Sequence, residues 1–340
     1  GWNVWTIGTV LVALAGCVPI VAVLAIAVGP GEEIWSHLVS TVLGLYVSTT
    51  LKLMLSVGFG TLIIGVGAAW LVSTCRFPGR RLFEWALLLP MAMPAYVIAY
   101  VYTDILEYAG PVQGLLRDIF GWTLKREYWF PEIRSLGGAA SMMTLVLYPY
   151  VYLLSRAAFL EQSVGVLEAS RMLGRGPWRS FFSVALPLAR PAIVIGVSLV
   201  LMETLNDFGT VDFFAVSTFT LGIYDVWLNM NNVAGAAQLA ALLLFFVVFL
   251  VLAERFGRRK QRFHHTTSKI KALKRYELQG RVRLLATIGC AAPVVFGFVL
   301  PALVLGGYGV IHFEAATSGQ VLRHAANSVL LSGLTAALAL

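Results

Sequence analysis

Charged side chains are scarce in this sequence. Asp, Glu, Lys and Arg make up only 12% of its 340 residues, whereas a soluble globular domain carries about 25%. Hydrophobic residues account for 59%, and many lie in runs of about 20 residues, the length that a helix needs to cross a bilayer. These runs lack the strict alternation of membrane β-strands. The composition excludes an ordinary soluble domain and predicts an all-α, polytopic membrane protein.

Arrangements of residues that carry out catalysis or bind cofactors are also missing. The three cysteines, Cys17, Cys75 and Cys290, give no disulfide framework. His264 and His265 are adjacent and have no cysteine nearby, which is not the spacing of a metal site. No Gly-x-x-x-x-Gly-Lys-Ser/Thr loop is present to hold nucleotide phosphates, and no nucleophile–base pair stands out. We therefore expect no bound metal or cofactor and no enzymatic activity in this chain.

The apolar runs predict seven complete spans and part of an eighth. We place the complete spans at 4–28, 46–73, 82–104, 136–155, 191–212, 233–254 and 284–306. The last run, 325–340, would cover only about 24 Å as a helix, whereas the hydrocarbon core of a bilayer is about 30 Å thick. We therefore expect this sequence to be part of a longer protein.

Basic residues between the spans predict the orientation. Loops 74–81, 156–190 and 255–283 hold 19 of the 25 Lys and Arg residues, and the loops on the other side hold five. Because basic residues accumulate on the cytoplasmic side of membrane proteins, we expect these three loops to be cytoplasmic. The net charge of +8 then follows from topology, and no nucleic-acid partner is needed to explain it.

Two short similarities at a common offset predict an internal repeat. Gly16–Pro19 resembles 289–293, and Ser48–Leu51 resembles Asn327–Leu330. Both pairs are separated by about 275 residues, with six spans between the copies. The second copy would therefore have the same orientation as the first, which is a parallel repeat.

Loop 156–190 contains the most specific pattern. Residues Glu161 to Leu173 have a helix-forming composition, and Gly174 can end such a helix in the left-handed conformation. A second short helix is predicted over 178–186, ending near Pro187. This helix–glycine–helix hairpin would form a rigid knob that a soluble partner could bind.

The loop resembles the EAA loop of ABC importer permeases, in which Glu-Ala-Ala is followed at fixed spacing by Gly, a β-branched aliphatic residue and Leu-Pro. The matching residues are Glu168, Ala169, Ser170, Gly174, Val184, Leu186 and Pro187. The resemblance implies a type I permease fold in a bacterial inner membrane. It also implies that the hairpin docks in a groove of the ATP-binding cassette subunit, where Glu168 meets a basic residue and Gly174 lets the backbone turn. ATP and Mg would bind to that partner, which would be present in two copies. A periplasmic or lipoprotein substrate-binding protein would deliver the cargo.

Further stretches resemble the fused ferric-iron (Fe3+) transport permeases most closely. They are Leu89–Val97, Phe130–Gly138, Leu147–Tyr152, Glu203–Val211 and Gln238–Ala240. This resemblance implies a first six-span permease domain at 1–254, a basic cytoplasmic linker at 255–283 and the start of a second permease domain at 284–340. ABC permeases for thiamine, phosphonate, polyamine or sulfate share this architecture and remain open. So does an ion-coupled secondary transporter or channel, which has a different mechanism.

Glu203 and Asp207 are candidates for the translocation path. They are four residues apart and would share one helical face near the outer end of the fifth span. Ionisable residues in a span usually face a polar cavity, and carboxylates suit a hard cation such as iron(III). The alternative is that both side chains lie at the level of the outer headgroups. We also expect Pro90, Pro94 and Pro149 to kink their helices.

Overall fold

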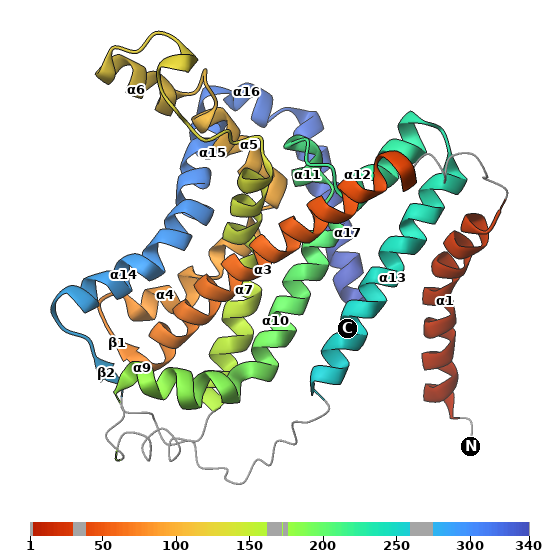
Figure 1. Ribbon diagram of the computed structural model, residues 1–340, viewed down its shortest axis with the longest axis horizontal. Helices are drawn as coiled ribbons and strands as arrows, with labels where there is room; N and C mark the ends of the chain where they lie inside the picture. Colours follow the sequence, from red (N-terminus) through yellow and green to blue (C-terminus); the bar gives the residue numbers. More distant parts are fainter. Residues whose placement is uncertain (1–2, 30–38, 162–171, 173–175, 259–274, 340) are drawn as a thin grey trace.

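The computed structural model describes residues 3–29, 39–161, 172, 176–258 and 275–339, which are almost entirely helical (Figure 1). The α-helices are α1 (Val4–Ala27), α3 (Leu43–Thr74), α4 (Arg80–Ala86), α5 (Ala95–Leu106), α6 (Pro111–Phe120), α7 (Leu136–Glu161), α9 (Pro177–Ser180), α10 (Leu186–Asn206), α11 (Gly209–Phe213), α12 (Phe219–Tyr224), α13 (Val233–Arg258), α14 (Gly280–Val294), α15 (Leu300–Ile311), α16 (Phe313–Ala316) and α17 (Gly319–Ala339). The short elements are the 3-10 turns η1 (Leu89–Ala92) and η2 (Lys125–Glu127), the π-helical turns η3 (Phe181–Ala185), η4 (Asp225–Asn229) and η5 (Val295–Val299), and the strands β1 (Cys75–Arg76) and β2 (Tyr276–Glu277).

The described residues contain six helices that are long and apolar enough to cross a bilayer. They are Trp5–Ala27, Leu43–Thr74, Leu136–Glu161, Trp178–Asn206, Val233–Leu252 and Gly280–Ile311. A bent pair of helical segments, Arg80–Ala92 and Ala95–Phe120, makes a seventh span if both halves are counted together. The seven predicted complete spans therefore correspond to these helices. The predicted partial span at 325–340 falls within α17, which is not among them.

The third predicted span is broken, not kinked. The segments on either side of Met93 and Pro94 meet at 90°. Met93 is extended, with φ −97° and ψ 119°, as expected for a residue before proline, and Pro94 then caps α5. Pro149, in contrast, lies inside the continuous helix α7. The expectation of one kinked helix over 82–104 was wrong because two prolines, separated by three residues, interrupt the backbone within one short stretch.

The fifth predicted span has different ends from those expected. Its helix continues from Trp178 through η3 into α10, so the predicted stop near Pro187 was wrong. The π-helical turn η3 lies directly before Leu186 and Pro187 and shifts the hydrogen-bond register where proline lacks an N–H. At the other end α10 stops at Asn206, and Asp207 is extended with ψ 119°. The predicted end at 212 was therefore also wrong.

The centre of the bundle is formed by α3, α7 and α10, which pack along one another. Glycine allows the backbones of α3 and α7 to approach each other closely. A Cβ atom on Gly65 would lie 2.7 Å from the Val151 Cβ and 3.0 Å from the Tyr148 carbonyl oxygen. Large side chains, Tyr148 and Tyr152 among them, fill the space around this contact and are fully buried. The core is thus built where small residues on α3 meet large ones on α7.

The helix made of α14, η5 and α15 packs against this same core, although it follows the linker in sequence. Cys290 is fully buried, and the Tyr102 hydroxyl of α5 donates a 2.7 Å hydrogen bond to the Phe296 carbonyl oxygen. Strand β2 pairs in parallel with β1, and the Leu278 N–H donates to the Arg76 carbonyl oxygen. Figure 1 shows α14 and α15 beside α4 and α5, while α1 lies along α13 on the far side. The spans on either side of the predicted linker therefore pack together, and the domain boundaries at 255 and 284 stay a prediction.

Candidate functional site

The predicted coupling loop is only partly described. Glu168, Ala169, Ser170 and Gly174 lie outside the described residues. Val184 is in η3, and Leu186 and Pro187 open α10. Val184 and Leu186 are half-buried and pack against the hydrophobic core, whereas Pro187 is exposed. The apolar residues at the end of the motif therefore anchor the loop to the bundle.

The segment from α9 to the first turns of α10 lies across one end of the bundle. Figure 1 shows it in green, running under the ends of the spans before α10 turns upward into them. The side chains of Ser180, Phe181 and Ala185 are buried. We call this end of the molecule the α9 end, and the opposite end, where α6 projects, the α6 end.

An aromatic cluster joins this segment to two spans. The Phe181 ring lies 5.0 Å from the Trp70 ring of α3 and 6.3 Å from the Phe159 ring of α7, measured between centroids. Trp70 and Phe159 also meet edge to face at 5.5 Å. Aromatic pairs of this kind contribute about 0.5–1.5 kcal/mol beyond the burial of their surface. These ring contacts join η3 to both α3 and α7.

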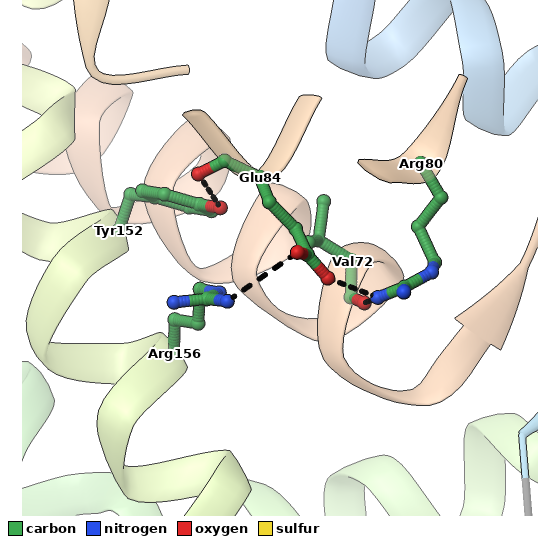
Figure 2. Close-up of polar contacts among 5 residues, drawn as sticks. All are labelled: Val72, Arg80, Glu84, Tyr152 and Arg156. Carbon is green, nitrogen blue, oxygen red and sulfur yellow. Dashed lines mark hydrogen bonds and ion pairs between the residues drawn. The ribbon is translucent and has the colours of Figure 1, made fainter. Parts of the chain in front are cut away.

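A second set of contacts at the α9 end holds α4 to its neighbours (Figure 2). Glu84 forms an ion pair and hydrogen bond with Arg80, and its other carboxylate oxygen lies 3.9 Å from the Arg156 Nη2 atom. Arg80 Nη1 also donates a 2.9 Å hydrogen bond to the Val72 carbonyl oxygen, and the Tyr152 hydroxyl donates to the Glu84 carbonyl oxygen at 3.1 Å. The side chains of Arg80, Glu84 and Arg156 are only 10%, 21% and 29% exposed. This Glu84 cluster fixes the first half of the broken span to α3 and α7.

The two predicted pathway residues do not share a helical face. Glu203 lies in the last turn of α10, where its side chain is exposed. Asp207 follows the helix, and its carboxylate accepts hydrogen bonds from the Thr210 N–H at 2.8 Å and the Thr210 hydroxyl at 3.0 Å. Asp207 therefore caps the start of α11, a structural role that the sequence pattern did not indicate. Assignment of either residue to a pathway stays a prediction.

The segment between α5 and α7 is ordered at the α6 end. Arg117 donates to the Tyr108 carbonyl oxygen at 2.8 Å and lies over the Tyr108 ring, while the Tyr128 hydroxyl donates to Gln113 Oε1 at 2.6 Å. Gln113 in turn donates to the Leu106 carbonyl oxygen. Within the part of the chain that the structure describes, no three His, Cys, Asp or Glu side chains gather into a metal site; His264 and His265 lie outside that part.

Residues 60–262 match the family of binding-protein-dependent transport system inner membrane components. The chain belongs to this family. Its members are permeases of ABC importers, whose ATPase activity resides on separate subunits. The expected family, the all-α polytopic fold and the membrane location are thereby confirmed. Membership also favours a binding-protein-dependent importer over an ion-coupled secondary transporter.

Individual relatives differ in the substrate that their names state. The Fe(3+)-transport system permease protein FbpB 2 of Haemophilus influenzae is 25% identical over 86% of this chain and 54% of its own length. The molybdenum transport system permease protein ModB of Escherichia coli is 28% identical over 58% of this chain and 86% of its own length. The sulfate transport system permease protein CysT of E. coli is 30% identical over 58% of this chain and 72% of its own length. The chain thus spans about half the length of the ferric permease that it matches.

The fold agrees with that of solved importers. A crystal structure of a bacterial alginate ABC transporter, in complex with an alginate pentasaccharide-bound periplasmic protein, contains a chain with a TM-score of 0.60 and 16% sequence identity. The alignment covers 74% of this chain and 93% of that one. At this identity the likeness shows the fold alone, which is the type I ABC importer permease fold.

Proposed function

We propose that this chain is the membrane-spanning permease of an ATP-driven importer and that the segment around 168–187 couples it to a separate ATPase subunit. The observation that carries the proposal is the family match over 60–262, combined with a segment that lies across the α9 end and packs on α3 and α7. The basic loops of the sequence supply the orientation. In this proposal the α9 end is cytoplasmic, and the α6 end receives a substrate-binding protein.

In this proposal ATP hydrolysis and transport take place on different subunits, so a movement must pass from one to the other. ATP and Mg bind to two copies of the partner subunit, whose movement displaces the segment that begins at α9. Phe181 passes that displacement to α3 and α7, and the Glu84 cluster keeps the first half of the broken span with them. The bundle can then alternate its opening between the two sides without any reactive group of its own.

Ferric iron is the cargo that we propose. The match to FbpB 2 extends over 86% of this chain, compared with 58% for ModB and CysT. An exposed carboxylate on a span, Glu203, also suits a hard cation better than a molybdate or sulfate anion, because like charges repel. An oxyanion permease is the second candidate, since two of the relatives are named for such substrates.

Uptake into proteoliposomes tests both parts of the proposal. The complete permease is reconstituted with its ATPase subunit and binding protein, and radioactive ferric iron, molybdate and sulfate are compared. We expect iron uptake that requires ATP and is abolished when the ATPase partner cannot hydrolyse it. Uptake of molybdate or sulfate without uptake of iron would refute ferric iron as the cargo. Uptake driven by an ion gradient without ATP would refute the ATP-driven mechanism.

A further inference from the structure

Arginine side chains gather at the α9 end, where loop 74–81 meets the end of the predicted linker. Arg76 ends β1, Arg80 and Arg81 open α4, and Arg275 directly precedes β2. The pKa of Arg275 is lowered by partial burial and by the positive charges of the other three arginines, although the Glu84 carboxylate raises it. Arginines from two loops that are far apart in sequence therefore lie close together. We call Arg76, Arg80, Arg81, Arg156 and Arg275 the arginine group.

The nearby carboxylates only partly neutralise the arginine group. Glu277 Oε1 lies 3.3 Å from Arg76 Nη1, and Glu84 is shared between two other arginines of the group (Figure 2). Five arginines and two glutamates leave a net charge of +3. Within the described part of the chain, no carboxylate forms an ion pair with Arg81 or Arg275, and both side chains are exposed. Two guanidinium groups are therefore open to an anion from outside the protein.

Exposed apolar side chains adjoin the arginine group on two helices that run into the membrane. The broken span begins with α4, the span after the linker begins with α14, and these two helices pack on each other. On α4, Leu82 and Trp85 are 68% and 75% exposed, and Trp85 shares a helical face with Arg81, four residues earlier. On α14, the exposed Arg283 is followed by Leu284, which is 61% exposed. Because Trp and basic residues concentrate at the membrane interface, this order places the arginine group at the level of the headgroups.

We propose that the headgroup of an anionic phospholipid binds to Arg81 and Arg275, in the leaflet that borders the α9 end. Its acyl chains lie along the exposed side chains of Leu82, Trp85 and Leu284. A guanidinium group binds phosphate oxygens through two parallel N–H···O bonds, and basic pockets between spans suit such headgroups. The net charge of +3 favours a lipid with a net negative charge over a zwitterionic one. The inference depends neither on the ATPase partner nor on the cargo.

The bound headgroup connects two parts of the chain that the linker separates in sequence. Arg81 precedes the linker, and Arg275 lies near its end. A phosphate held by both replaces the repulsion between like charges with two attractive contacts. It thereby reinforces the parallel pairing of β1 with β2, which involves only two residues of each strand. Because a ligand that binds the folded state alone stabilises it, the permease should unfold at a higher temperature with anionic lipid.

Thermal unfolding of the complete permease in detergent micelles tests the site. Phosphatidylglycerol and phosphatidylcholine with identical acyl chains are added separately, so that only the headgroup differs. At a lipid concentration about 100 times the dissociation constant, phosphatidylglycerol should raise the Tm by at least about 2 °C more than phosphatidylcholine does. An equal increase for the two lipids would overturn the proposal. The same increase on addition of inorganic phosphate would also overturn it, because the arginine group would then be a site for a free anion.

Arg81→Gln combined with Arg275→Gln removes the two proposed headgroup contacts. The extra increase in Tm given by phosphatidylglycerol should disappear. The Tm without lipid should not fall, because both side chains are exposed and two like charges are removed. Arg126→Gln with Arg323→Gln is the matched control, because it also removes two exposed arginines, from η2 and α17, and it should keep the increase. A double variant that retains the wild-type increase, or a control that loses it equally, would overturn the site.

Native mass spectrometry measures the bound lipid directly and does not depend on unfolding. The wild-type permease is released from micelles that contain both lipids in equal amounts, and the lipids that stay bound are counted. We expect it to retain phosphatidylglycerol at least about tenfold better than phosphatidylcholine, and we expect the variant without Arg81 and Arg275 to retain the two lipids alike. An unchanged preference in that variant would show that the headgroup binds elsewhere and would overturn the proposal.

Discussion

Replacing Glu84 by glutamine should destabilise the α9 end of the bundle. The change removes the negative charge that Arg80 and Arg156 share, and both of these side chains are largely buried. Breaking a buried ion pair by removing one partner costs about 3–5 kcal/mol. Arg80 keeps its hydrogen bond to the Val72 carbonyl oxygen, and Arg156 is 29% exposed, so we expect a smaller loss of about 2–3 kcal/mol.

Thermal unfolding of the detergent-solubilised protein measures this loss. With an unfolding entropy of about 2.1 cal/mol/K per residue, 2–3 kcal/mol lowers the Tm by about 3–4 °C. Glu277→Gln is the matched control, because its ion pair with Arg76 is 69–74% exposed and such pairs contribute about 1 kcal/mol or less. Adding Arg156→Gln to Glu84→Gln should cost less than the sum of the single changes, because it removes the unpaired cation. Strict additivity, or an unchanged Tm for Glu84→Gln, would refute the cluster as described.

Three other predictions concern separate parts of the chain. Gly65→Ala places a Cβ 2.7 Å from the Val151 Cβ and should lower the Tm by several degrees. Gly67→Ala is the control, because its Cβ would meet no atom within 4 Å and its Tm should be unchanged. Equal changes in Tm for the two variants would contradict the packing of α3 on α7. Glu203→Gln should slow iron uptake without loss of stability. Asp207→Ala should cost about 1 kcal/mol of stability, because it removes the hydrogen bonds to Thr210, and should leave uptake intact. Slower uptake by Asp207→Ala together with a destabilised Glu203→Gln would contradict both assignments. Hydrogen bonds from the N–H groups of residues 123 and 124 lower the pKa of Glu127, so its capping contribution is complete above the ordinary glutamate value and is lost as the pH falls through the lowered pKa. Protection factors of these two amides, corrected for the pH dependence of intrinsic exchange, should therefore fall at acidic pH, and unchanged protection factors would contradict this.

Much of the architecture could be predicted from the sequence because the bilayer imposes it. Spans follow from apolar runs, and the seven complete spans predicted correspond to the helices observed when the broken pair is counted once. The ends of the fifth span could not be predicted in this way. Hydropathy continues past Asp207 through Phe208 and Val211, but the Asp207 carboxylate binds the Thr210 N–H and ends the helix. A local hydrogen bond outweighed the apolar pattern.

Contacts between distant residues account for most of what the sequence could not show. The Arg80–Glu84 pair is four residues apart on one helix and could have been recognised from its spacing. Its third member, Arg156, lies 72 residues further on and meets Glu84 only because α4 folds against α7. The grouping of Trp70, Phe159 and Phe181 depends on tertiary structure in the same way. The motif located the proposed coupling segment, and packing determined which of its described side chains face the bundle.

The position of α14 and α15 bears on how such a permease can be assembled. These helices follow the linker in sequence, yet they fill the core formed before it, through buried Cys290 and the hydrogen bond from Tyr102 to the backbone of Phe296. We therefore expect a chain cut between residues 259 and 274 to yield two fragments that bind each other through the packing of α14 and α15 on α4 and α5. One gene or two genes could encode the same assembly, and joining the halves would fix their ratio during synthesis without creating the interface between them.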